Sequence, residues 1–134
     1  MRVLLDTNVI IAAFASRGLC NALFESCIGA HEIIMCEKIL DEVSEKLKHK
    51  LRLPEGIIRQ ILLLLRTHAI LVVPVDVAQN AVRDKKDLMV LGAALTGKVR
   101  YIVTGDKDLL AIGTYKDVTI ITPRSFWEKM KEQR

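Results

Sequence analysis

The chain has 134 residues, of which 51% are apolar and 27% are charged, and its formal net charge is +4. This length excludes two large independent cores, and the apolar content can fill one core without disulfides or a structural metal. We therefore expect residues 1–134 to form a single domain. The modest positive charge is compatible with a polyanionic partner but does not require one.

Short apolar runs alternate along the chain with longer segments of helical periodicity. The runs predict strands at residues 2–5, 32–35, 69–73, 100–104 and 118–121. The periodic segments predict helices at residues 8–14, 18–28, 38–51, 54–66, 87–96 and 106–112, and a last helix that begins at Pro123. Proline suits the first turn of a helix, which is where Pro54 and Pro123 would stand.

Strands that alternate with helices predict an α/β fold, a three-layer sandwich with a five-stranded parallel sheet between helices. The strands lack the polar alternation of a half-exposed sheet, which agrees with a sheet covered on both faces. In such sheets, ligands bind beyond the carboxyl ends of the strands. Polar residues that directly follow a strand are therefore candidates for a functional site.

Acidic residues stand at several of these positions. Asp6 directly follows the first strand, and Asp106 follows the fourth strand after one glycine. Asp87 opens the buried helix before that strand, and Glu42 lies on a helix from which it could reach the same place. Each aspartate could instead cap or charge a helix N-terminus. Glu42 could be a solvated surface residue, and periodicity does not separate it from Asp41.

Carboxylates gathered in one cleft repel one another, so such a cluster normally needs a cation. Oxygen ligands without histidine or cysteine select Mg²⁺ or Mn²⁺ rather than zinc. These ions support phosphodiester hydrolysis, because they activate a water molecule and neutralise charge on the leaving oxygen. The pattern therefore favours a metal-dependent hydrolase.

Four segments resemble, in order, the motifs of PIN-domain nucleases. They are Leu-Leu-Asp-Thr-Asn-Val at residues 4–9, Ile-Leu-Asp-Glu-Val at 39–43, Arg-Asp-Lys-Lys-Asp at 83–87, and Tyr-Ile-Val-Thr-Gly-Asp-Lys-Asp-Leu-Leu at 101–110. The closing residues 120–126 are similar to a subfamily described as toxin components of toxin–antitoxin pairs. The likeness runs from residue 1 to about residue 127. Each motif alone is weak, and their order makes the set specific.

The resemblance implies an endoribonuclease that cleaves single-stranded RNA with Mg²⁺ or Mn²⁺. It implies that Asp6, Asp87 and Asp106 are the metal ligands, directly or through water, and that Glu42 completes the catalytic set. Three further residues would support this site: Asn8 and Thr104 by orienting the carboxylates through hydrogen bonds, and Asp108, because either aspartate of the fourth motif could face the metal.

The third motif departs from the family pattern, because Lys85 and Lys86 stand where relatives often carry proline and acidic or amide residues. This departure leaves open whether the site binds one metal ion or two. The two lysines could contact RNA phosphates or simply be solvated.

Two other functions fit parts of the pattern. A phosphatase of the haloacid dehalogenase type also places an aspartate after its first strand, but it requires a second aspartate where this chain has Asn8. A catalytically silent PIN-fold module that binds RNA or acts as a scaffold would keep the fold without the chemistry. The presence of all four acids argues against that second alternative.

The partners implied by the resemblance are a single-stranded RNA substrate, an antitoxin protein and a second copy of the chain in a homodimer. The helix at residues 57–65 is apolar enough to line an interface, although it could equally be core. Neither a signal peptide nor a membrane span is expected. Cys20, Cys27 and Cys36 form no Cys-x-x-Cys pair, which suits reduced thiols in the cytoplasm.

Overall fold

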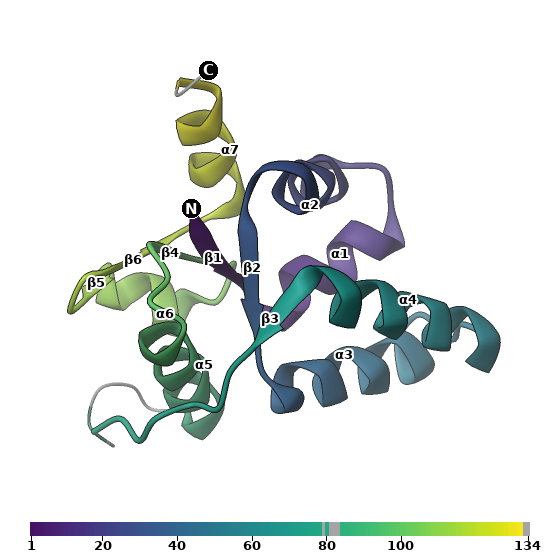
Figure 1. Ribbon diagram of the computed structural model, residues 1–134, viewed down its shortest axis with the longest axis horizontal. Coiled ribbons are helices and arrows are strands. Elements are labelled where there is room, and N and C mark those ends of the chain that lie inside the picture. The colour runs from purple at the N-terminus through teal and green to yellow at the C-terminus, as the bar shows by residue number, and fades with distance from the viewer. Residues whose placement is uncertain (79, 81–83, 133–134) are drawn as a thin grey trace.

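The computed structural model describes residues 1–78, 80 and 84–132 of the chain. Within these residues the chain forms six strands and seven helices (Figure 1). The strands are β1 (Arg2–Leu5), β2 (Glu32–Met35), β3 (Ala69–Leu71), β4 (Tyr101–Val103), β5 (Thr114–Tyr115) and β6 (Val118–Ile121). The helices are α1 (Thr7–Ala15), α2 (Leu19–Ala30), α3 (Glu37–His49), α4 (Glu55–His68), α5 (Lys85–Thr96), α6 (Lys107–Ile112) and α7 (Pro123–Glu132).

The strands form one sheet in the order β3-β2-β1-β4-β6-β5. The first five in this order are parallel, and β5 adds a short antiparallel edge to β6. The predicted α/β class and the five parallel strands are thus confirmed, with β5 as an addition. From β1 the chain continues outward through β2 and β3, and it later returns to the other side through β4 and β6. The boundary between β1 and β4 is therefore the point at which the strand order reverses.

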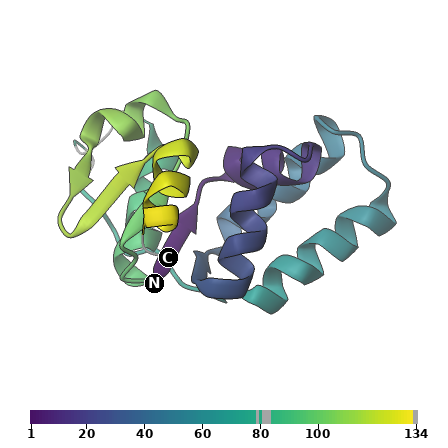
Figure 2. The same cartoon turned by 90° about the horizontal axis from the view of Figure 1, so that it is seen from above.

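Helices cover both faces of the sheet. α1, α2, α3 and α4 lie on one side of β1 and β2, and α5 and α6 lie on the other (Figures 1 and 2). α7 packs against α2. Val3, Leu4 and Leu5 of β1 have no exposed surface, as expected of a central strand between two layers.

Helices α3 and α4 form a hairpin that extends away from the sheet (Figure 2). α3 is amphipathic and buries Ile39, Leu40, Val43 and Leu47, all of which lie in the helix predicted at residues 38–51. α4 begins after Pro54, and it buries Ile58, Ile61 and Leu65 on one side only.

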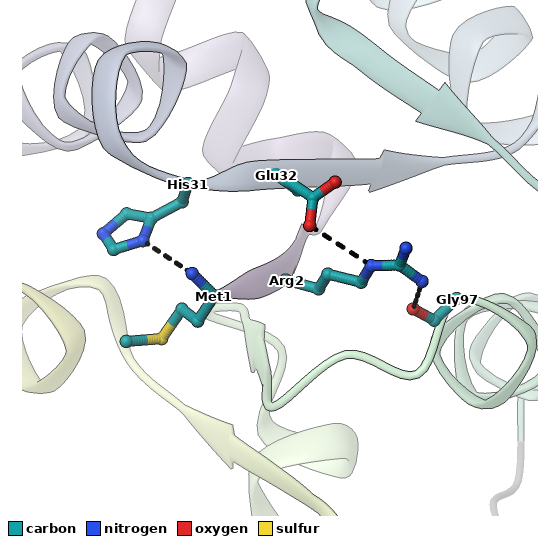
Figure 3. Close-up of polar contacts among 5 residues, drawn as sticks. All are labelled: Met1, Arg2, His31, Glu32 and Gly97. Carbon is teal, nitrogen blue, oxygen red and sulfur yellow. Dashed lines mark hydrogen bonds and ion pairs between the residues drawn. The ribbon is translucent and has the colours of Figure 1, made fainter.

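The amino-terminal edge of the sheet is held by polar contacts (Figure 3). The Arg2 guanidinium donates to Glu32 on β2 at 3.4 Å and to the Gly97 carbonyl after α5 at 3.2 Å. The amino group of Met1 lies 3.4 Å from His31 Nδ1. These contacts fix the start of β1. A ligand site is expected at the opposite edge of the sheet, beyond the carboxyl ends of the strands.

No helix among the described residues is both long and apolar enough to cross a membrane alone. The bent pair formed by α1 and α2, which meet at 107°, passes such a test by length and composition only.

Candidate active site

Asp6 is fixed at the carboxyl end of β1 by three hydrogen bonds. Its backbone N–H donates to the Val103 carbonyl of β4 at 3.0 Å, which continues the strand pairing by one residue. Its Oδ1 accepts from the Thr7 backbone N–H at 2.9 Å, so Asp6 also caps α1. Its Oδ2 accepts from the Thr104 hydroxyl at 2.7 Å. Burial raises the pKa of Asp6 despite these hydrogen bonds.

Thr104 connects Asp6 to Asp106. Its side chain is fully buried at the carboxyl end of β4, and its backbone N–H donates to Ile121 of β6 at 3.0 Å. The hydroxyl donates to Asp6 and accepts from the Asp106 backbone N–H at 2.9 Å. One hydroxyl group therefore sets the positions of two acids that stand on either side of the reversal in strand order.

Asp106 caps α6, because its Oδ1 accepts from the backbone N–H groups of Asp108 and Leu109 at 2.8 and 3.1 Å. The capping interpretation considered from the sequence is therefore correct for Asp6 and Asp106. Capping and site formation are compatible, because a carboxylate has several lone pairs and the cap engages only some of them.

Asp87 is the most unusual carboxylate of the set. It lies in the first turn of α5, where Asp84 rather than Asp87 is the cap. The side chain is only 5% exposed, and its Oδ2 is buried without a hydrogen-bond partner among the described residues. Burial, followed by the negative charges of Asp106 and other nearby aspartates, raises the pKa of Asp87 to about 6. An unpartnered buried oxygen of this kind needs a ligand or a proton.

Glu42 reaches the same place from α3. Its side chain is half-buried, and its Oε2 accepts from the Thr7 hydroxyl at 3.1 Å. The neighbouring Asp41 is exposed. The structure thus separates two acidic residues that sequence periodicity could not.

These acids surround one pocket of about 160 Å³ at the carboxyl edge of the sheet. All four acids predicted from the sequence line it. The full lining consists of Asp6, Thr7, Asn8, Glu42, Lys46, Asp84, Lys86, Asp87, Val90 and Asp106. The chain therefore brings carboxylates from α3, α5 and the ends of β1 and β4 into one small space.

The donor set fits a hard divalent cation. Asp87, Asp106 and Asp108 each offer a carboxylate oxygen, and these oxygens all lie within 4.8 Å of one another. Asp108 therefore joins Asp106 near the pocket, and Asp6 lines the pocket without belonging to this closest group.

Four lining residues were not predicted as site residues: Thr7, Lys46, Asp84 and Val90. Thr7 is 3% exposed and orients Glu42, whereas the sequence suggested Asn8 and Thr104 for orienting carboxylates. Asn8 Oδ1 instead accepts from Lys46 Nζ at 2.7 Å. Lys46 stands one helical turn after Glu42, so the spacing i, i+4 was the signal that could have found it. Arg83, the first residue of the third motif, lies outside the described residues.

The sequence matches the family model described as PIN domain over residues 2–108. Among solved structures, a chain in the crystal structure of VapBC2 from Rickettsia felis bound to a DNA fragment from their promoter is similar in fold. It aligns with a TM-score of 0.62 and 13% identity over 91% of this chain and 98% of that chain. None of the curated proteins compared with the sequence matches it.

Proposed function

The chain belongs to the PIN domain family, and on that premise we propose that it is a metal-dependent endoribonuclease that hydrolyses phosphodiester bonds of single-stranded RNA. The observation that carries the proposal is the meeting of Asp6, Glu42, Asp87 and Asp106 in one pocket. Carboxylates held this close are suited to binding Mg²⁺ or Mn²⁺, and one of them has a buried oxygen with no hydrogen-bond partner in the described part of the chain.

Each acid has a proposed role. Asp87 and Asp106 would hold the ion, and Asp6 and Asp108 would be further ligands, directly or through water. A bound Mg²⁺ or Mn²⁺ supplies an activated water and neutralises charge on the leaving oxygen. Glu42, held by the Thr7 hydroxyl, is the carboxylate that orients the attacking water. Thr104 fixes the positions of Asp6 and Asp106 relative to each other through one hydrogen bond to each residue.

Cleavage of a labelled single-stranded RNA with Mn²⁺, Mg²⁺ or EDTA tests the proposal. We expect cleavage with either ion and none with EDTA. Asp6→Asn should lose cleavage by at least 100-fold while RNA binding persists, because it removes a charged ligand and keeps the side-chain shape. Single-stranded DNA and duplex RNA serve as substrate controls. Undiminished cleavage by Asp6→Asn would show that Asp6 does not take part in catalysis.

The same assay separates the alternatives. A silent RNA-binding or scaffold module would bind the RNA and leave it intact in every metal condition. A phosphatase of the haloacid dehalogenase type would release phosphate from a simple phosphomonoester. Its second aspartate is replaced here by Asn8, and the lack of a second carboxylate at this position favours the nuclease.

We also propose that the protein is the toxin of a toxin–antitoxin pair, with an antitoxin protein as its partner. The fold similarity to a chain of the VapBC2 structure supports this proposal. Expression of the wild-type chain should arrest growth, Asp6→Asn should not, and co-expression of a small neighbouring gene product should relieve the arrest. Normal growth on expression of a cleaving wild-type enzyme would contradict the toxin assignment.

Three features of the whole chain complete the proposal. Residues 1–134 act as one nuclease domain, which limited proteolysis of the folded protein checks. The protein works in the cytoplasm, because Cys20, Cys27 and Cys36 are free thiols, and cell fractionation checks this. It forms a homodimer through the exposed apolar residues of α4 and β3.

A further inference from the structure

Lys46 is a cation inside the acidic pocket. It lies on α3 one turn after Glu42, and both side chains point to the start of α1. Glu42 accepts from the Thr7 hydroxyl at 3.1 Å, and Lys46 Nζ donates to Asn8 Oδ1 at 2.7 Å. Two successive residues of α1 thus hold a negatively charged and a positively charged side chain of α3 next to each other. Glu42 and Lys46 both line the pocket.

No ion pair among the described residues neutralises the charge of Lys46. The ion pairs among the described residues join Arg2 to Glu32, His49 to Glu45 and Arg66 to Glu37, and Lys46 takes part in none of them. Its hydrogen bond goes to a neutral amide although carboxylates line the same pocket. An ammonium group has three N–H donors, so two remain for another acceptor.

A phosphodiester that enters this pocket is an anion among carboxylates, and it needs a nearby positive charge. Lys46 and Lys86 are the cationic side chains that line the described part of the pocket. Within the described part of the chain, no hydrogen bond or ion pair holds the Lys86 ammonium, whereas Asn8 holds that of Lys46. A side chain that is already held loses less conformational freedom when it binds a ligand.

We infer that Lys46 binds a phosphate group of the RNA strand at the α3 side of the pocket, with Asn8 as the residue that positions its ammonium group. This inference rests on the proposed ribonuclease function and adds a substrate contact to it. It also gives a use to the Asn8 side chain, which makes no hydrogen bond to a carboxylate among the described residues.

The test measures binding of a labelled single-stranded RNA by fluorescence anisotropy in EDTA, over a series of salt concentrations. Lys46→Gln keeps a donor for Asn8 but removes the charge, whereas Lys46→Arg keeps the charge. We expect Lys46→Gln to weaken binding about tenfold and to reduce the salt slope by about 0.7, the loss of one phosphate contact on a single strand. Lys46→Arg should stay near the wild type in both measurements.

Lys48→Gln is the matched control, because Lys48 is exposed on the same helix and does not line the pocket. Asn8→Ala should weaken binding less than Lys46→Gln, since it frees the ammonium without removing it. Melting temperatures show that the variants are folded. With Mn²⁺, Lys46→Gln should raise KM for cleavage more than it lowers kcat.

Wild-type affinity and salt slope in Lys46→Gln, or an equal loss in Lys48→Gln, would overturn the inference and leave the ribonuclease proposal intact. A loss in Lys46→Arg as large as that in Lys46→Gln would also overturn it, since the charge would then not be the cause. A wild-type chain that neither cleaves nor binds single-stranded RNA would overturn the proposed function and this inference together.

Discussion

At the scale of single residues, the Thr104 hydroxyl is the group on which two acids depend. Thr104→Val keeps the shape of the buried side chain and removes both hydrogen bonds, to Asp6 Oδ2 and from the Asp106 backbone N–H. We expect cleavage or Mn²⁺ affinity to fall about 10- to 100-fold. The free energy of unfolding should fall by about 1–2 kcal/mol, because two groups lose a partner.

Thr104→Ser is the control for this change, since it restores the hydroxyl and removes only a methyl group. It should retain most of the cleavage activity and metal affinity. Calorimetric titration with Mn²⁺ and thermal unfolding in EDTA measure the two effects separately. Equal metal affinity in Thr104→Val and the wild type would show that the hydroxyl does not organise the acids.

Asp87 predicts how stability depends on pH in the metal-free protein. Its folded-state pKa of about 6 lies above the ordinary value of 3.8. Between these values the folded chain retains a proton that the unfolded chain has released, so this contribution to stability is lost as pH rises through about 6. Asp87→Asn cannot ionise. In EDTA it should therefore be more stable than the wild type at pH 8, by on the order of 1 kcal/mol.

The advantage of Asp87→Asn should shrink toward pH 4.5, where the wild-type carboxyl is protonated. Thermal unfolding at both pH values measures the difference, and Mn²⁺ at pH 8 should raise the melting temperature of the wild type only. An equal difference in stability at both pH values would contradict the raised pKa of Asp87.

The sequence predicted which acids meet, because position after a strand and motif order both carry information about the sheet edge. Among the groups that hold them, it predicted Thr104, which donates to Asp6 Oδ2, but not Thr7, which donates to Glu42. Thr7 was not predicted as a site residue, because a threonine directly after a capping aspartate is common at the start of a helix. Its contact with Glu42 joins residues 35 positions apart, and no local pattern records such a contact. The contact between Lys46 and Asn8 joins residues 38 positions apart, and the i, i+4 spacing after Glu42 places Lys46 on the same side of α3 without predicting this contact.

At the scale of elements, the long periodic segments and the buried strands were predicted well. β1, β2 and β6 have the predicted bounds, and the helices differ by a few residues at their ends. β5 was missed, because Thr114–Tyr115 is too short for periodicity and exists only through antiparallel pairing with β6. The third strand is shorter than predicted and ends at Leu71.

Gly92 is where α5 approaches the segment that follows β3. A Cβ atom at this position would lie 2.2 Å from the Val75 carbonyl oxygen and 3.3 Å from Pro74 Cβ. The backbone carbonyl cannot rotate away, so Gly92→Ala should destabilise the fold by about 1–3 kcal/mol. Chemical denaturation of the metal-free protein measures the change.

Gly29 on α2 provides the matched control, because a Cβ there meets nothing within 4 Å. Gly29→Ala should leave stability equal or slightly higher, since alanine loses less backbone entropy than glycine in a helix. Similar stability of the two variants would show that α5 can shift away from residues 74 and 75 at little cost.

At the scale of the whole molecule, the exposed apolar surface is concentrated in one part of the chain. The large exposed hydrophobic side chains of the described residues all lie between residues 57 and 75: Ile57, Leu63, Leu64, Ile70, Leu71, Val73 and Val75. From the sequence, the helix at residues 57–65 could be either core or interface. In the structure α4 has both buried and exposed apolar residues, and the buried ones are Ile58, Ile61 and Leu65. An apolar patch of this kind usually marks an association site.

We expect the proposed homodimer to use this patch. Leu63 is 67% exposed on α4, so Leu63→Asp should weaken self-association at least tenfold without unfolding the chain. Lys129→Asp on the exposed side of α7 is the control and should leave association unchanged. Sedimentation velocity at several concentrations measures both. A wild-type chain that stays monomeric at about 100 µM would contradict the proposed homodimer.

The bond between Thr104 and Asp6 joins residues 98 positions apart, and this separation has a consequence for biosynthesis. A nascent chain of the first hundred residues contains β1, β2 and β3 but not β4, so Asp6 has neither its strand neighbour nor its hydroxyl partner. Asp106 and Asp108 have not yet been made. The growing polypeptide therefore carries no assembled acidic pocket until β4 and the residues directly after it have been made.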